Sequence, residues 1–280
     1  MVCAHDHGGR VACVPVTWPA RGSIKSSMSS IPPRWFTALS KLFQEHPQAN
    51  STSKTLRPNP KELWSTNIVS PVAHLATIDK DVRTPQVRSC IIRELISPEG
   101  SKHLPLILIS TDVRNRKIEQ IHANDTGQIS WWIEPSGDQF RLTGTVTIVA
   151  EPGSGASHSG GSGAAFQRLS AGGFDWEAKR VRMFDGVGGK LRASRYNPAP
   201  GSPMDGGYEE LGKWPDTVPT TTGATTAEEK KRVEQALANF ALLLVEPTHV
   251  DWYQTGAVPD RRTLFCMGDD EAWTETVVVP

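Results

Sequence analysis

The chain has 280 residues, enough to bury one sizeable core and carry extensions, although this length also permits two domains. Its 30 basic and 30 acidic side chains balance to a formal net charge of +0, which excludes a molecule drawn as a whole to nucleic acid or anionic lipid. The four cysteines are scattered without a CxxC pair, and no apolar run approaches the ~18 residues of a membrane span. We therefore expect a soluble protein in a reducing, cytoplasmic setting, with no membrane or nucleic-acid partner.

Residues 1–30 carry Arg10, Arg21 and Lys25 against a single acid, Asp6, and lack the compact apolar core of a secretory signal. We predict a disordered extension, with organellar targeting left open as the alternative. This segment also contains four residues of types that bind zinc: Cys3, His5, His7 and Cys13. Their spacing matches no usual zinc site, so we favour coincidence and expect no metal.

The first ordered region begins with a helix and continues as strands. Trp35, Leu39 and Phe43 recur at helical spacing, which predicts an amphipathic helix over residues 34–46. A polar, proline-bearing stretch over residues 48–71 predicts a loop. Strand-like runs follow, interrupted by a helix over residues 112–122 with Asp112 or Asn115 as N-cap. These runs cover residues 72–78, 83–95, 104–111, 128–134 and 139–150.

The second half has mixed character. Residues 151–163 are rich in glycine and serine and predict a flexible linker, and residues 186–222 predict irregular structure. Thr226 and Glu229 form a capping-box pattern ahead of a helix. Other helices are expected at 164–169 and 175–184, and strands at 239–253, 262–267 and 272–279.

This order of elements lacks the strand–helix alternation of a parallel nucleotide-binding sheet. It predicts a mainly β protein, an antiparallel β-barrel with flanking helices whose last strands come from the C-terminus. We expect residues 31–280 to form a single domain with a flexible or irregular insertion around residues 151–225. Trp131 and Trp132 are adjacent on one strand and must point to opposite faces.

Several familiar motifs are missing. The glycines of residues 151–163 do not complete GxGxxG, and the sequence contains no GK[ST], HExxH or GxSxG. These absences argue against nucleotide-loop, metalloprotease and hydrolase mechanisms.

Basic and hydroxyl side chains gather where the strand ending at Thr111 meets the following helix. A phosphate monoester is nearly dianionic and favours guanidinium groups, hydroxyl donors and helix N-terminal amides, all of which this junction offers. Any one of these arginines is more often a solvated surface residue, so only the combination indicates a phosphate site. It comprises Arg88, Arg93, Ser110, Thr111, Arg116 and Lys117.

Three blocks give this cluster a specific resemblance. In order, they are PQVRSCIIR (residues 85–93), LILISTDVRNRKIEQI (106–121) and ISWWIEPSGDQFRLTGTV (129–146). In order and spacing they resemble the pyridoxamine 5′-phosphate oxidase family. The resemblance covers residues 34–150 and, more loosely, 239–280.

The resemblance implies an FMN-binding split barrel and a homodimer with FMN at the subunit interface. It implies that the strand segment from Arg88 through Ser89, Cys90 and Ile91 to Arg93 lines the FMN. It further implies that Ser110 and Thr111 bond the cofactor, that Arg116 and Lys117 hold its phosphate, and that three later residues contact the flavin: Gln139, Trp252 and Arg262.

The chain also departs from the family pattern. Val258, Pro259 and Asp260 stand where the family's oxidases carry an Arg-x-His pair, and Arg93 stands where they use a lysine. The resemblance therefore predicts an FMN-dependent oxidoreductase whose substrate and catalytic residues it leaves undefined. Two alternatives stay open: a flavin-binding or flavin-storing protein without catalysis, and a strand-rich interaction domain without a cofactor.

Overall fold

The computed structural model describes residues 2–5, 11–14, 24–25, 31–45, 72–158 and 163–280, the first three of these ranges by their backbone alone. The described strands are β1 (Val2–His5), β2 (Val11–Val14), β3 (Ile24–Lys25), β4 (Val72–Ile78), β5 (Pro85–Ile96), β6 (Leu106–Asp112), β7 (Thr126–Ile133), β8 (Asp138–Val149), β9 (Phe240–Gln254), β10 (Arg261–Met267) and β11 (Trp273–Val278). The α-helices are α1 (Arg34–Glu45), α3 (Arg116–Ala123), α4 (Ala164–Ala171), α5 (Trp176–Gly186), α6 (Gly189–Tyr196) and α7 (Ala227–Ala238), with 3₁₀ turns η2 (Glu134–Ser136) and η3 (Gly207–Lys213).

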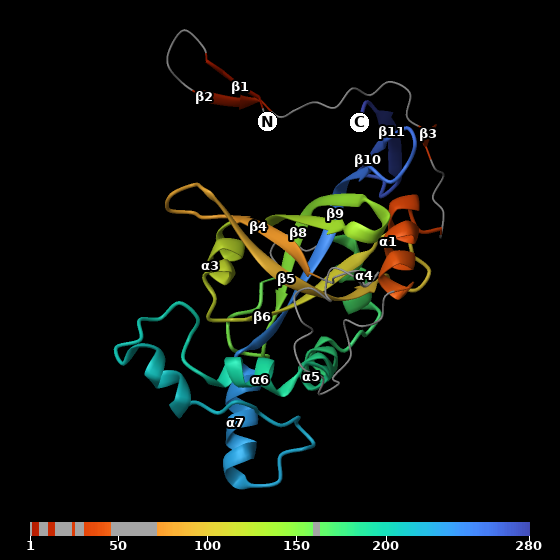
Figure 1. Ribbon diagram of the computed structural model, residues 1–280. Coiled ribbons are helices and arrows are strands. Elements are labelled where there is room, and N and C mark those ends of the chain that lie inside the picture. The colour runs from red at the N-terminus through yellow and green to blue at the C-terminus, as the bar shows by residue number, and fades with distance from the viewer. Residues whose placement is uncertain (1, 6–10, 15–23, 26–30, 46–71, 159–162) are drawn as a thin grey trace.

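Six antiparallel strands close into a barrel. Their order is β9, β6, β5, β4, β7 and β8, and the pairing of β8 with β9 closes the ring. Strands β10, β11 and β3 continue the sheet outward from β9, and β1 pairs with β2 in a separate two-stranded sheet. Figure 1 shows α5, α6 and α7 grouped below the barrel, with α1 and α3 on opposite sides of it in this view. The mainly β antiparallel barrel with flanking helices is confirmed.

The barrel interior is the main core. Every second residue of β7 points inward, so Trp131 is fully buried while its neighbour Trp132 is 48% exposed, as the alternation predicts. Helix α1 covers one part of this core with an apolar face, and the inward residues of β9 complete it. The residues of α1 in the core are Trp35, Phe36 and Leu39.

A second apolar cluster lies on the outer face of β6 and β9. Because both faces of these strands are covered, their sequences read as nearly continuous apolar runs rather than alternating ones. The outward Phe240 meets Phe184 of α5, and the Arg180 guanidinium donates to the carbonyls of Leu237 and Phe240. Helices α5, α6 and α7 are thereby packed against the barrel wall. We infer a single domain over residues 31–280, because the two clusters share these strands.

Several element predictions are confirmed. The helix over 34–46 and the strand over 72–78 match α1 and β4, and Thr226 with Glu229 forms the complete capping box of α7. Asn115 occupies the N-cap position of α3, but its side chain makes no capping bond.

The main difference lies in the stretch expected to be irregular. Residues 186–222 contain α6 and η3, and α6 buries Ala193 together with two arginines, Arg192 and Arg195. Residues 151–158 turn back onto β8, where His158 and Ile148 exchange backbone hydrogen bonds. Composition indicated disorder here because glycine and proline are abundant, whereas packing on β6 and β9 supplies the order.

Some expectations fall outside the described residues. These are the loop over 48–71, residues 159–162 of the linker and most of the N-terminal extension, together with the side chains of Cys3, His5, His7 and Cys13. Among the helices of the described part of the chain, none combines the length and apolar character that crossing a bilayer requires.

Candidate functional site

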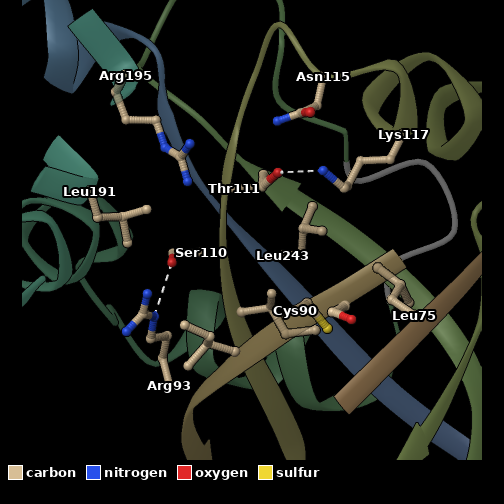
Figure 2. Close-up of a pocket in the computed structure, with 13 residues that line it drawn as sticks. Leu75, Cys90, Arg93, Ser110, Thr111, Asn115, Lys117, Leu191, Arg195 and Leu243 are labelled. Carbon is tan, nitrogen blue, oxygen red and sulfur yellow. Dashed lines mark hydrogen bonds between the residues drawn. The ribbon is translucent and has the colours of Figure 1, made fainter. Parts of the chain in front are cut away.

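A cavity of about 190 Å³ opens where β5 and β6 face α3 and α6 (Figure 2). Apolar side chains from β4, β5, β6, β9 and α6 form part of its wall, and polar and cationic side chains form the rest. The thirteen lining residues are Leu75, Ser89, Cys90, Ile91, Arg93, Ile109, Ser110, Thr111, Asn115, Lys117, Leu191, Arg195 and Leu243.

Strand β5 presents Arg88 and Arg93 differently. Alternation places Arg88 on the same side as the fully buried Ile92, and it donates to Thr77 Oγ1 at 2.6 Å and Gln120 Oε1 at 2.9 Å. Burial lowers the pKa of Arg88. Arg93 lies on the opposite side with Ser89 and Ile91, and its Nε donates to Ser110 Oγ at 3.0 Å. Arg93 therefore lines the cavity, whereas Arg88 does not.

The junction of β6 and α3 supplies the second cation. Lys117 Nζ donates to Thr111 Oγ1 at 3.3 Å across the mouth of the cavity. Burial, reinforced by the positive charges of Arg88 and Arg195, lowers the pKa of Lys117 to about 8. The same burial raises the pKa of the Cys90 thiol to about 11, so this cysteine is neutral near pH 7.

Helix α6 supplies the third cation. Leu191 and Arg195 are four residues apart and so share one helix face, which is turned toward the cavity. Arg195 is only 9% exposed, and its buried Nε has no hydrogen-bond partner. Its nearest carboxylate contact is Asp112, at 3.9 Å from Nη1.

The cavity therefore has an excess of positive charge. Of the described residues that line it, three are cationic and none carries a carboxylate. Asp112 is fully buried nearby, but Arg114 already binds it through two nitrogens at 3.0 and 2.7 Å. Buried cations without counter-charges are costly, and an anion that accepts their hydrogen bonds relieves that cost. The arrangement is suited to binding a phosphate or carboxylate group.

The structure brings together most of the residues predicted at this junction. Ser89, Cys90, Ile91, Arg93, Ser110, Thr111 and Lys117 all line the cavity. Arg116 does not; its side chain is 73% exposed and its guanidinium lies 3.3 Å from Asp79. The three flavin-contacting candidates from later strands are also absent from the lining: Gln139, Trp252 and Arg262.

These later residues lie on β8, β9 and β10, outside the cavity lining. Trp252 is buried, stacks on Phe140 and donates from Nε1 to Asp138 at 2.6 Å. Gln139, Tyr253 and Arg262 lie side by side on β8, β9 and β10 on the outward face. Arg262 is held there by two hydrogen bonds to Asp251 at 3.1 and 2.9 Å. A cofactor that contacts these residues therefore needs a binding surface in addition to the cavity.

Sequence reasoning missed Arg195 and Leu191. Both lie in the stretch that was expected to be irregular, where glycines precede α6 and prolines follow it. The i, i+4 spacing of Leu191 and Arg195 was the available signal, but a helix of eight residues gives too few turns for the periodicity to stand out.

The closed antiparallel barrel with its cationic cavity defines the class of this protein as a split barrel. Residues 33–150 match the family model described as "Pyridoxamine 5′-phosphate oxidase, FMN-binding domain", which confirms the resemblance seen in the sequence. No curated protein matches the chain significantly.

One solved structure supports the same fold. A pyridoxamine 5′-phosphate oxidase-related, FMN-binding protein from Nostoc punctiforme is 19% identical with a TM-score of 0.58, and the match covers 90% of this chain and 100% of that chain. PhzG from Burkholderia lata, solved in complex with tetrahydrophenazine-1-carboxylic acid, is 11% identical with a TM-score of 0.45. That match covers 82% of this chain and 100% of the PhzG chain.

Proposed function

We propose that the chain binds FMN, with the cofactor's phosphate in the cavity between β5, β6, α3 and α6. The observation that carries the proposal is the set of three cations, one buried and two partly buried, that have no carboxylate beside them in the lining, two of them within the stretch that matches an FMN-binding domain model. Lys117 and Arg93 would hold the phosphate oxygens, assisted by the hydroxyls of Ser110 and Thr111. Arg116 and Arg88 stay predictions from the resemblance.

The size of the cavity favours a site completed by a second subunit. Pockets for small molecules usually measure roughly 300–1,000 Å³, and this cavity of about 190 Å³ accommodates only part of a flavin nucleotide. We propose a homodimer in which Gln139, Trp252 and Arg262 of one subunit approach the flavin in the cavity of the other. The outward position of Gln139 and Arg262 supports this arrangement, whereas Trp252 would need its indole ring to become accessible.

Mixed dimers test this arrangement. Lys117→Gln and Arg262→Gln damage the same site from opposite subunits, so each homodimer should lose tight FMN binding. A mixed dimer should regain one intact site with wild-type affinity. Calorimetric titration of the purified mixed dimer gives the stoichiometry. A monomer at micromolar concentration, or mixed dimers without a tight site, would contradict the proposal.

In this role the protein's residues bind and orient rather than react. FMN, when bound, supplies the hydride-accepting or hydride-donating chemistry. We propose an FMN-dependent oxidoreductase whose substrate is undefined, and we assign no catalytic residue.

One observation favours a second candidate, a flavin-binding or flavin-storing protein without catalysis. Asp260 lies in the β9–β10 loop, outside the cavity lining, and accepts a hydrogen bond from the Tyr253 hydroxyl at 2.9 Å. Val258, Pro259 and Asp260 thus stand where the resemblance places the Arg-x-His pair of the oxidases. Reduction of the bound flavin by NADH or NADPH, followed by turnover with an electron acceptor, would favour the enzyme. Binding without reduction by any donor would favour storage.

The proposal as a whole is tested by the colour of the purified protein. We expect flavin absorption bands and release of FMN, rather than riboflavin, when the protein is denatured. Apoprotein reconstituted with FMN should regain these bands. A colourless protein that fails to bind added FMN would indicate the cofactor-free interaction domain instead.

The affinity for FMN should fall as the pH rises. In the free protein Lys117 has a pKa of about 8, and a bound dianion should raise this pKa. Below about pH 8, Lys117 is already protonated in the free protein. Above about pH 8, Lys117 must take up a proton when FMN binds. From about pH 8 up to the raised pKa of Lys117 in the complex, we expect affinity to drop by up to tenfold per pH unit. Fluorescence titration across this range measures it.

Lys117→Arg provides the matched control, because a guanidinium stays charged throughout this range. The variant should bind FMN with an affinity that changes little with pH, apart from the titration of the flavin itself. If the wild type and this variant show the same pH dependence, Lys117 is not the group responsible.

A further inference from the structure

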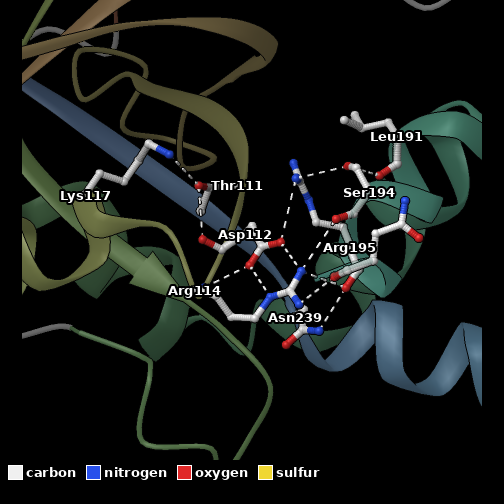
Figure 3. Close-up of polar contacts among 9 residues, drawn as sticks. Thr111, Asp112, Arg114, Lys117, Leu191, Ser194, Arg195 and Asn239 are labelled. Atoms are coloured by element: carbon white, nitrogen blue, oxygen red, sulfur yellow. Dashed lines mark hydrogen bonds and ion pairs between the residues drawn. The ribbon is translucent and has the colours of Figure 1, made fainter. Parts of the chain in front are cut away.

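Arg114 links the end of helix α6 to the barrel through hydrogen bonds (Figure 3). The Arg114 guanidinium, which follows the end of β6, binds the buried Asp112 carboxylate. The same guanidinium donates to the carbonyls at the end of α6: Asn197 at 2.8 Å, Arg195 at 3.0 Å and Ser194 at 3.5 Å. The last carbonyls of a helix have no partners within the helix, so these bonds fix the end of α6.

A second contact supports the same end of the helix. Asn239, just before β9, donates from Nδ2 to the carbonyl of Arg195 at 2.8 Å. The carbonyl of Arg195 therefore accepts hydrogen bonds from a residue that follows β6 and from a residue that precedes β9. The side chain of Arg195 is left to extend toward the cavity (Figures 2 and 3).

The Arg195 guanidinium is incompletely satisfied in that position. Its Nε is buried without a hydrogen-bond partner, and Nη1 reaches the hydroxyl of Ser194 at 3.3 Å. The Asp112 carboxylate, at 3.9 Å, lies beyond hydrogen-bonding distance. Burial also lowers the pKa of Arg195. A guanidinium this buried normally has its donors paired, so the structure indicates an absent acceptor.

We propose that Arg195 binds an anionic group on the α6 side of the cavity and that Arg114 is its positioning residue. This inference rests on the proposed function. It adds to that function a residue outside the stretch of residues 33–150 that matches the FMN-binding domain model. The ligand chemistry is a phosphate monoester or a carboxylate, which a guanidinium can bind through two parallel hydrogen bonds. This anion is either the phosphate of FMN or an anionic group of a substrate bound beside it.

Arg195→Gln tests the binding role, with Lys190→Gln as its matched control. Lys190 is exposed on the same helix and absent from the cavity lining, so its substitution removes one charge without changing the cavity. Each variant is titrated with FMN and with riboflavin, which lacks the phosphate. Inorganic phosphate is then titrated into the FMN-loaded protein by calorimetry.

The outcomes separate the two sources. If Arg195 binds the cofactor's phosphate, Arg195→Gln should weaken FMN binding at least about tenfold and leave riboflavin binding unchanged. If it binds a substrate anion, FMN binding should be unchanged while phosphate binding to the loaded protein is lost. Wild-type binding of both FMN and phosphate by Arg195→Gln would overturn the inference. Arg195→Lys, which keeps the charge, should restore part of the affinity and shows that the loss is not a failure to fold.

The positioning role of Arg114 is tested by a double-mutant cycle. Arg114→Lys keeps a cation beside Asp112, but its three N–H donors cannot replace the two hydrogen bonds to the carboxylate and the three to carbonyls. It should weaken anion binding in the wild-type background and have no further effect in Arg195→Gln. Equal losses in both backgrounds would indicate a general structural role and contradict positioning.

A phosphate titration without flavin distinguishes failure of FMN binding from failure of the anion site at Arg195. If the wild-type chain binds no flavin, inorganic phosphate titrated into the chain alone still tests Arg195. Binding that Arg195→Gln abolishes and Lys190→Gln preserves would retain the anion site and reject FMN. No phosphate binding by the wild-type chain, loaded or unloaded, together with unchanged FMN affinity in Arg195→Gln, would reject Arg195 as an anion ligand.

Discussion

Gly144→Ala is expected to prevent stable closure of the barrel. Gly144 lies in β8 beside the register shift where this strand pairs with β9, and a Cβ atom there would sit 1.9 Å from the carbonyl oxygen of Glu246 and 2.7 Å from Pro247 Cα. Both neighbours are backbone, so relief requires moving one strand away from the other. We expect a loss of at least about 3 kcal/mol in the free energy of unfolding, at the upper end of overpacking costs. Urea unfolding monitored by tryptophan fluorescence measures it.

Gly186→Ala is the matched control. Gly186 is the last residue of α5, and a Cβ atom there would meet nothing within 4 Å. Alanine favours a helix over glycine by up to about 1 kcal/mol, so this variant should be as stable as the wild type or slightly more stable. A Gly144→Ala protein as stable as Gly186→Ala would show that β8 and β9 do not approach as closely as described.

Lys117→Gln is expected to have the largest effect on cofactor binding. Its side chain is partly buried and lines the cavity, and its ammonium group donates a hydrogen bond to the Thr111 hydroxyl. A charge-assisted hydrogen bond contributes up to about 3 kcal/mol, so we expect FMN affinity to fall about 100-fold and riboflavin affinity to change little. The stability of the apoprotein should be maintained, because the substitution removes a desolvated charge. Fluorescence titration and thermal unfolding measure the two effects.

Arg116→Gln is the informative comparison for Lys117→Gln. The resemblance implies that both side chains hold the phosphate, but Arg116 is 73% exposed and faces Asp79. An exposed ion pair contributes about 1 kcal/mol or less, so we expect a much smaller loss of affinity than for Lys117→Gln. Equal losses would support the role that the resemblance gives Arg116. Loss of riboflavin binding to the same extent as FMN binding would contradict a phosphate role for Lys117.

The sequence predicts the barrel well because strand alternation and apolar runs report local burial. Trp131 and Trp132 illustrate this, since adjacent strand residues must separate to opposite faces. The capping box at Thr226 is equally local, because its partners lie three residues apart.

The site is harder to predict because its residues depend on register and on distant packing. Arg88 and Arg93 belong to one predicted strand, and alternation places them on opposite faces, but only the packing of β6 and α6 shows that the face of Arg93 borders a cavity while Arg88 donates to Thr77. Arg195 reaches it through contacts from Arg114 and Asn239, 81 and 44 residues away in the chain. No local pattern encodes such contacts.

A crystal structure of the complex with FMN would test the proposed phosphate site. We expect the phosphate to lie between β6 and α3, with one oxygen about 2.7–2.9 Å from Lys117 Nζ, the length of a charge-assisted hydrogen bond. We also expect the flavin ring to extend toward a second subunit. A flavin phosphate bound elsewhere, with Lys117 and Arg93 facing only solvent, would contradict the proposed site.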